Sequence, residues 1–252
     1  MDLLPRQRIV ILAALAAIAG LAWLYLFIAA ADMTAAMAGM DRAMAMPSRS
    51  AIELLLLFAM WSVMMVGMML PGVTPVILTF GTVNRNRRAR GEPYVPSALF
   101  TAGYLLAWIG FSLAATLAQE ALERAGLLSP MDMTTNSRLL GGFLFLAAGL
   151  YQFTPVKLAC LRFCRSPIDF VVNHWRDGPV GALRMGLTHG LYCLGCCWIL
   201  MLLLFVGGVM NLLWVALLAI VVLGEKLAAG PWIGRAGGVL LAGYGIWLIA
   251  TY

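Results

Sequence analysis

The amino-acid sequence predicts an all-α protein, a polytopic bundle of about seven transmembrane helices. The composition is the first observation: of 252 residues, 63% are hydrophobic and only 11% are charged, whereas soluble domains carry about 25% charged residues. The second is a mean hydropathy of +0.92. The third is a series of apolar runs, most of them long enough to cross the roughly 30 Å hydrocarbon core of a bilayer. The chain is therefore expected to be an integral membrane protein.

The apolar runs divide the chain into an N-terminal helix over residues 1–31, a methionine-rich external loop over 32–50 and a membrane-embedded helical bundle over 51–252. The first run is longer than the apolar core of about 7–15 residues that signal peptides have, so a retained helix is expected. If this run were a cleaved signal, six spans would remain. The seven predicted spans are residues 9–31, 51–73, 95–118, 138–155, 186–206, 209–226 and 234–251.

The second span has recognisable signals at its start and near its end. Ser50 and Glu53 have the spacing of a capping box, in which each side chain bonds to a free backbone N–H group of the other. Glu53 is therefore expected at a helix terminus rather than inside the membrane. Pro71 and Pro75 cannot donate a backbone hydrogen bond, so they are expected to bend or end this helix.

Glycine marks the later spans. Only Gly207 and Gly208 separate the fifth span from the sixth, which predicts a tight hairpin. The fourth span is expected to have a helical continuation that carries Cys160 and Cys164. Stripes of small residues on the fifth and seventh spans predict close contacts between helices. They are Gly186 and Gly190 on the fifth, and Gly234, Gly238 and Ala242 on the seventh.

The positions of Lys and Arg predict the orientation in the membrane. With the N-terminus inside, the inner segments hold thirteen of the 17 Lys and Arg residues and the outer segments hold four. Short cytoplasmic loops carry an excess of positive charge. The protein is therefore expected to be a multi-pass protein of the bacterial inner membrane with a cytoplasmic N-terminus. The net charge of +6 follows from topology, so the expected partner is the lipid bilayer and no nucleic acid.

One apolar span carries an unusual set of donor atoms. His189, Cys193, Cys196 and Cys197 lie within about 100° of one another around an ideal helix. Thiol and imidazole are soft or borderline ligands that suit Cu(I) and, as a less favoured metal, zinc. In the alternative interpretation, the cysteines pack as small hydrophobic residues and the histidine bonds to a nearby carbonyl.

Methionine supplies a second set of soft donors, with 16 in the chain. Five of them lie within residues 33–46 of the external loop. Thioethers bind soft metals without losing a proton, so this segment is predicted to capture Cu(I) outside the membrane. Its candidate ligands are Met37, Met40 and Met44. An Ala/Met-rich linker or an interfacial helix is the alternative.

The second span carries a further methionine stripe. Met60, Met64 and Met68 recur every four residues and share one helix face. A stripe of this kind usually fills gaps in a core. The predicted topology, however, places three groups of donors at similar depth near the inner side, which predicts one shared metal site. The groups are Met64 with Met68, His189 with Cys193, and Cys160 with Cys164.

The sequence also disfavours several kinds of protein. No charged residue falls in the middle of a predicted span, whereas ion-coupled carriers place ionisable residues there. No Ser–His–Asp set and no phosphate-binding glycine loop is present, so an enzyme is not expected. Cys193 and Cys196 do have the spacing of a redox motif. A membrane thiol–disulfide oxidoreductase therefore stays open as an alternative, as does a structural or assembly subunit of a larger membrane complex.

These residues also carry a resemblance. The chain resembles a bacterial family of predicted metal-binding integral membrane proteins, over about residues 52–247. The resemblance implies metal binding and a link to copper, without a defined activity, and it leaves out the segment 33–46. It rests on six stretches: Trp61–Pro71, Gly149–Leu161, Cys164–Pro167, Gly186–Trp198, Gly207–Leu212 and Glu225–Lys226.

The leading hypothesis is an inner-membrane protein that handles Cu(I) as a conduit or as a membrane chaperone. The external methionines would collect the metal, the second-span stripe would pass it on, and the donors of the fifth span would hold it. Cys160 and Cys164 would form an inner exit. A metallochaperone or a larger membrane complex is the expected protein partner.

Overall fold

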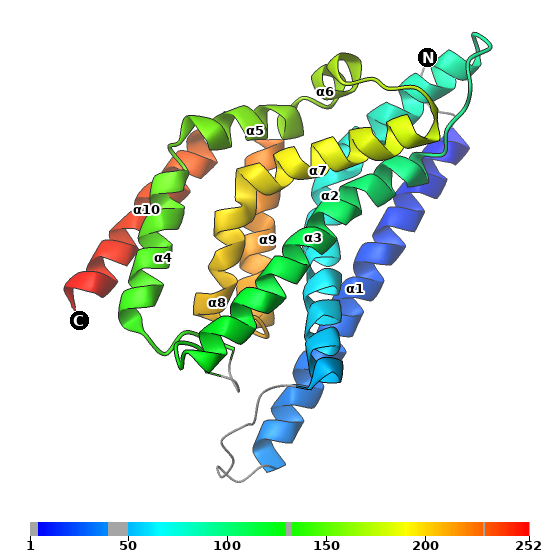
Figure 1. Ribbon diagram of the computed structural model, residues 1–252. Coiled ribbons are helices and arrows are strands. Elements are labelled where there is room, and N and C mark those ends of the chain that lie inside the picture. The colour runs from blue at the N-terminus through cyan, green and yellow to red at the C-terminus, as the bar shows by residue number, and fades with distance from the viewer. Residues whose placement is uncertain (1–4, 40–49, 130–132, 229, 252) are drawn as a thin grey trace.

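The computed structural model describes residues 5–39, 50–129, 133–228 and 230–251, and within these ranges the protein is helical apart from one isolated β-bridge between Leu128 and Thr135. The predicted helical bundle is confirmed (Figure 1). The helices are α1 (Pro5–Gly39), α2 (Ala51–Arg88), α3 (Ser97–Arg124), α4 (Arg138–Tyr151), α5 (Pro155–Arg165), α6 (Pro167–Asn173), α7 (Gly178–Leu202), α8 (Leu204–Gly207), α9 (Leu212–Leu227) and α10 (Trp232–Ala250).

Fewer helices qualify as membrane spans than the seven that the sequence predicts. Within the described ranges, α1, α2, α3, α10 and the combined α7–α8 segment are long and apolar enough to cross a bilayer, and α4 with α5 adds a sixth if the bent pair counts as one span. The predicted sixth span, which forms α9, does not qualify, because a helix of 16 residues is only about 24 Å long. The protein is a multi-pass helical membrane bundle with at least one short helix inside it.

The capping box predicted at the start of α2 is present, and the helix runs further than the predicted span. Ser50 and Glu53 form the complete capping box. Pro71 and Pro75 do not end the helix, which continues to Arg88. Each proline removes one backbone hydrogen bond, but a long helix packed between α1, α3 and α9 retains enough contacts to offset that loss. Between the two prolines, the Thr74 hydroxyl also donates to the Leu70 carbonyl oxygen.

The helix α7 occupies the centre of the bundle, with α3 packed along one side (Figure 1). The two helices approach so closely that a Cβ atom on Gly186 would overlap the backbone of Phe100. A second tight pair forms between α4 and α10, where a Cβ on Gly149 would lie 2.7 Å from the Gly238 carbonyl oxygen. The predicted small-residue stripes therefore lie at helix contacts.

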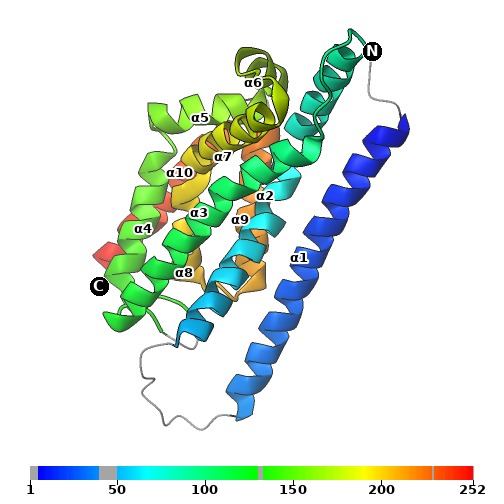
Figure 2. The ribbon, with the colours of Figure 1, turned by 45° about the vertical axis from the view of Figure 1, so that its right-hand side comes forward.

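The first helix lies at the edge of the bundle, as Figure 2 shows. It packs mainly against α2, and only 17% of its most apolar window is buried inside the protein. It continues as a helix to Gly39, so residues 32–39 of the predicted external loop extend α1.

The fourth predicted span does not continue straight into the next helix. Thr154 caps the start of α5 and Pro155 occupies its first turn, and the axes of α4 and α5 differ by 65°. Proline at this position has no N–H group to continue the preceding helix, so α4 ends and a new helix begins. The predicted helical continuation is therefore interrupted, and residues 155–165 form a separate helix, α5, that packs against α7 and reaches the upper end of α9 (Figure 1).

The predicted hairpin between the fifth and sixth spans takes the form of a short turn. Gly208 adopts φ = 92°, a left-handed conformation that glycine reaches without strain. The Trp214 indole donates to the Leu203 carbonyl oxygen at 2.9 Å, which ties the start of α9 to the end of α7.

Candidate metal centre

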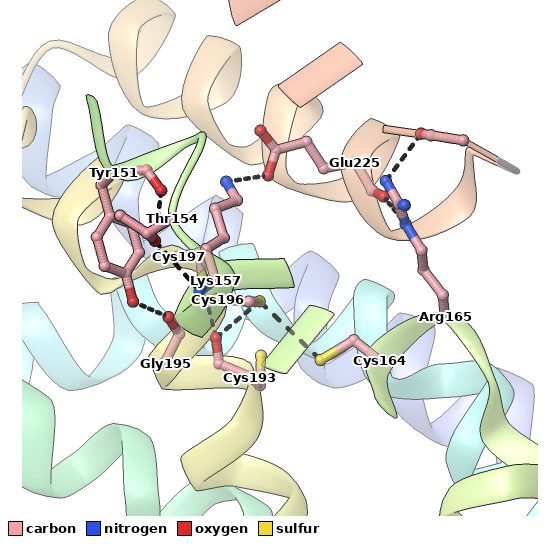
Figure 3. Close-up of polar contacts among 11 residues, drawn as sticks. Tyr151, Thr154, Lys157, Cys164, Arg165, Cys193, Gly195, Cys196, Cys197 and Glu225 are labelled. Atoms are coloured by element: carbon pink, nitrogen blue, oxygen red, sulfur yellow. Dashed lines mark hydrogen bonds and ion pairs between the residues drawn. The ribbon is translucent and has the colours of Figure 1, made fainter. Parts of the chain in front are cut away.

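Three cysteine sulfurs converge in the interior. The Sγ atoms of Cys164 on α5 and of Cys193 and Cys196 on α7 all lie within 4.8 Å of one another. The closest approach with a recorded distance is 4.0 Å, between Cys164 and Cys196 (Figure 3). Their residues are 6%, 1% and 1% exposed, so the group is shielded from solvent. All five cysteines of the chain are free thiols.

Local helix geometry brings two of these sulfurs together. Cys193 and Cys196 are three residues apart, so they share a face of α7. The thiols of Cys196 and Cys197 both donate to the Cys193 carbonyl oxygen at 3.0 Å (Figure 3). The bend between α4 and α5 supplies the third sulfur, because it turns Cys164 toward α7.

Polar contacts hold α5 in this position. The Tyr151 hydroxyl, at the end of α4, donates to the Gly195 carbonyl oxygen at 2.5 Å. Lys157 and Glu225 form an ion pair at 2.6 Å with side chains only 1% and 2% exposed. Arg165 donates to the carbonyl oxygens of Glu225 and Gly230 at 2.8 and 3.0 Å (Figure 3). The position of Cys164 thus depends on contacts with both α7 and α9.

Three further side chains lie around Cys193. The Lys226 ammonium lies 3.1 Å from the Cys193 sulfur and 3.8 Å from the Met69 sulfur. The Tyr104 hydroxyl lies 3.1 Å from the same thiol and donates to the Met69 carbonyl oxygen at 3.2 Å. A cation, a phenol and a thioether from three different helices therefore meet at one cysteine.

The other predicted donors of α7 do not join the sulfur group. His189 is 1% exposed, and its ring packs edge-on against Phe170 at a centroid distance of 4.6 Å. Its Nδ1 atom has no hydrogen-bond partner among the described residues. Cys197 is fully buried, one residue beyond Cys196, and it too lies outside the group of three. Of the four donors predicted on this face, Cys193 and Cys196 therefore belong to the sulfur group, whereas His189 and Cys197 lie beside it.

Cys160 also lies apart from Cys164. It is partly exposed, one turn earlier on α5, and its sulfur faces Gly195, where an added Cβ would lie 2.7 Å away. The two cysteines that the sequence paired as an exit therefore have different environments. Cys164 faces the buried sulfurs, and Cys160 faces the backbone of α7.

The methionine candidates are distributed along α2. Met60, Met64 and Met68 are buried, with exposures of 5%, 0% and 4%. The thioether with a recorded contact to the cysteine surroundings is that of Met69, from the neighbouring stripe. Met37 lies in the last part of α1, of which the backbone alone is described, and Met40 and Met44 lie outside the described residues.

Charged residues are the functional candidates that sequence reasoning missed. Lys157, Glu225 and Lys226 fall at or beyond the ends of the predicted spans, yet all three are buried. Glu225 and Lys226 stand in one of the stretches that carry the family resemblance, which was the available signal. Sequence position alone could not reveal the burial, because it arises from α5 crossing over the end of α9.

The donor chemistry defines the kind of site. Three buried sulfurs with no carboxylate among them suit a soft cation such as Cu(I) and are poorly suited to Mg²⁺ or Ca²⁺, which require oxygen ligands. The low-dielectric surroundings strengthen the attraction between a cation and a thiolate. The fold and this centre together define a membrane-embedded helical protein with a candidate site for a soft metal ion.

Comparison with known proteins is consistent with this class. The sequence model of the PpoB2 family, described as a copper chaperone, matches residues 58–248. The chain therefore belongs to the PpoB2 copper chaperone family, which confirms the copper-linked resemblance. No curated protein and no solved structure gave a significant match.

Proposed function

We propose that this protein is a copper chaperone of the bacterial inner membrane that holds Cu(I) between the sulfurs of Cys164, Cys193 and Cys196. The observation that supports this function is the convergence of three buried thiols in a chain that belongs to a copper chaperone family. Zinc is the less favoured cargo, because structural zinc sites are almost always tetrahedral with four protein ligands. The protein has no catalytic activity of its own in this proposal.

The proposal includes a route along α2. Met60, Met64 and Met68 are buried and recur on one face of the helix, and Met69 lies next to Lys226 near Cys193. Copper collected by the methionines of residues 33–46 would move along these thioethers to the cysteine centre. A neutral thioether binds weakly enough to pass the metal on, whereas thiolates retain it. The recipient would be a metallochaperone or a larger membrane complex.

Copper stoichiometry in purified protein tests the proposal. Under reducing conditions, the wild type should bind about one Cu(I) at the thiolate centre, and a Cys164→Ser/Cys193→Ser/Cys196→Ser variant should lose this metal because a serine hydroxyl is a hard ligand. Cys160→Ser is the matched control and should bind as the wild type does. Equal copper content in the triple variant and the wild type would contradict the proposed site.

A second candidate function is thiol–disulfide exchange, which the 4.0 Å distance between the sulfurs of Cys164 and Cys196 favours. Mild oxidation followed by peptide mass analysis distinguishes it. An oxidoreductase would form a Cys164–Cys196 disulfide and reduce a small disulfide substrate in the absence of copper. A copper chaperone would bind Cu(I) only in the fully reduced state and would show no such turnover.

A further inference from the structure

A second group of soft donors lies near the start of α2, away from the cysteine centre. A cavity of about 250 Å³ opens there between α1, α2 and two loops. Three methionines from three separate segments line it: Met60 on α2, Met133 before α4 and Met210 before α9. The remaining lining residues are Tyr25, Glu53, Leu56 and Leu57.

Met133 has an unusual backbone conformation. It is the one residue other than glycine with a positive φ among the described residues, at 50°. A residue with a side chain rarely adopts this conformation, and it is often found at functional sites. The Met133 N–H donates to the Ser129 carbonyl oxygen at 2.9 Å, which fixes the turn. Met133 is only 8% exposed.

The charge at the cavity favours a cation. Glu53 lines the cavity and its carboxylate is held in the capping box, where it accepts from the Ser50 N–H at 3.0 Å. The cavity is open to its surroundings and Glu53 is exposed, and a carboxylate held beside such a cavity attracts cations to it. No lysine or arginine is among the residues that line this cavity. The donors are thus three neutral thioethers with one negative charge beside them.

The cavity also lies at the end of the bundle where copper would enter. Figure 1 shows the start of α2, the turn between α8 and α9 and the start of α4 all at the lower end. In the predicted topology this is the outer side, and the methionine-rich residues 33–46 lead directly into α2 in the sequence.

We propose that Met60, Met133 and Met210 form a second site, a thioether pocket that binds one soft monovalent cation, Cu(I) or Ag(I). Thioethers are neutral, so the metal binds without proton release and without a change in oxidation state. Met60 also begins the buried stripe of α2, and Met69 lies about 14 Å further along the helix. The pocket is the loading site of the route that ends at the cysteine centre. This inference rests on the proposed copper function and adds to it a defined point of entry.

Titration with Ag(I), which mimics Cu(I) and does not oxidise, tests the pocket. In the Cys164→Ser/Cys193→Ser/Cys196→Ser background, the further changes Met133→Leu and Met210→Leu should remove one bound Ag(I). In the chain with intact cysteines, the same two changes should likewise reduce the stoichiometry by one. Leu has nearly the same volume as Met, so each change should leave the fold intact.

Met185→Leu is the matched control, since Met185 is 1% exposed in α7 and is not among the cavity residues. It should leave Ag(I) stoichiometry unchanged. The pocket is refuted if Met133→Leu/Met210→Leu binds as much Ag(I) as its parent in both backgrounds, or if Met185→Leu loses the same amount. The proposed chaperone function fails separately, if the chain with intact cysteines binds no Cu(I) at the thiols.

Discussion

The ammonium of Lys226 is buried against sulfur rather than against a carboxylate. Its recorded contacts are Cys193 and Met69, and within the described part of the chain no salt bridge is recorded for it, whereas the nearby Lys157 pairs with Glu225. A buried charge is costly without a partner of opposite sign. One Cu(I) held by three thiolates carries a net charge of −2, so Lys226 is placed to offset part of the negative charge of the loaded centre.

Replacement of Lys226 should therefore weaken copper binding. Lys226→Gln removes the charge and keeps a polar side chain, and we expect its Cu(I) affinity to fall by about tenfold or more, since loss of one partner of a buried charge pair is costly. Competition with a Cu(I)-specific chelator measures this change. Lys226→Arg should recover part of the affinity, which a purely steric role for the lysine would not explain.

The exposed Arg235 provides the control for net charge. Arg235→Gln changes the charge of the chain by the same amount without altering the centre, so its affinity should match that of the wild type. If Lys226→Gln and Arg235→Gln bind copper equally, Lys226 is not the counter-ion.

At the scale of elements, the α4–α10 pair supports the centre indirectly. α5 follows α4 after the bend at Thr154 and Pro155, so a displacement of α4 moves Cys164. Gly149 is the closest point of the pair, because a Cβ there would lie 2.5 Å from the Ala242 nitrogen. The register of α4 against α10 therefore constrains where the third sulfur lies.

Gly149→Ala should force these helices apart. We expect the free energy of unfolding to fall by about 1–3 kcal/mol, the usual cost of overpacking, and copper affinity to fall with it. Thermal unfolding in detergent measures the first effect. Gly243→Ala is the matched control on α10, since a Cβ at Gly243 meets nothing within 4 Å. Equal stability of both variants would show that the pair tolerates separation.

At the scale of the whole molecule, the two groups of soft donors lie at different heights along the bundle. The methionine cavity lies at the end where α2 begins, and α5, which carries Cys164, lies near the opposite end of the bundle, where α9 ends (Figure 1). If the predicted orientation holds, the cavity faces outward and the cysteine centre lies nearer the cytoplasm. Copper would then move inward along α2.

Thiol labelling checks this orientation. Single cysteines introduced at the exposed Arg88 and Arg176 should resist an impermeant reagent applied to intact cells, because the excess of Lys and Arg predicts that both are cytoplasmic. Single cysteines at the exposed Ser50 and Arg138 should be labelled. The protein with its five native cysteines alone gives the background labelling. Labelling of a cysteine at position 88 from outside the cell would reverse the predicted orientation and with it the inferred direction of copper movement.

The sequence by itself determined the properties that depend on local patterns. Apolar runs predicted the helices, the spacing of Ser50 and Glu53 predicted a capping box that the structure contains, and three-residue spacing placed Cys193 and Cys196 on one face of α7. The copper-linked family was also recognisable, because its motifs are contiguous stretches such as Gly186–Trp198. These features require only helix geometry or short segments of sequence.

Only the tertiary structure decided which donors meet. Cys164 reaches α7 because the chain bends by 65° between α4 and α5, an angle that the presence of Pro155 does not specify. Lys226 reaches Cys193 across 33 residues of sequence, and Met133 joins Met60 through a loop with an unusual backbone conformation. Helical periodicity determines which residues share a face of one helix. The sites are determined by how separate helices and loops pack together, and that depends on long-range contacts.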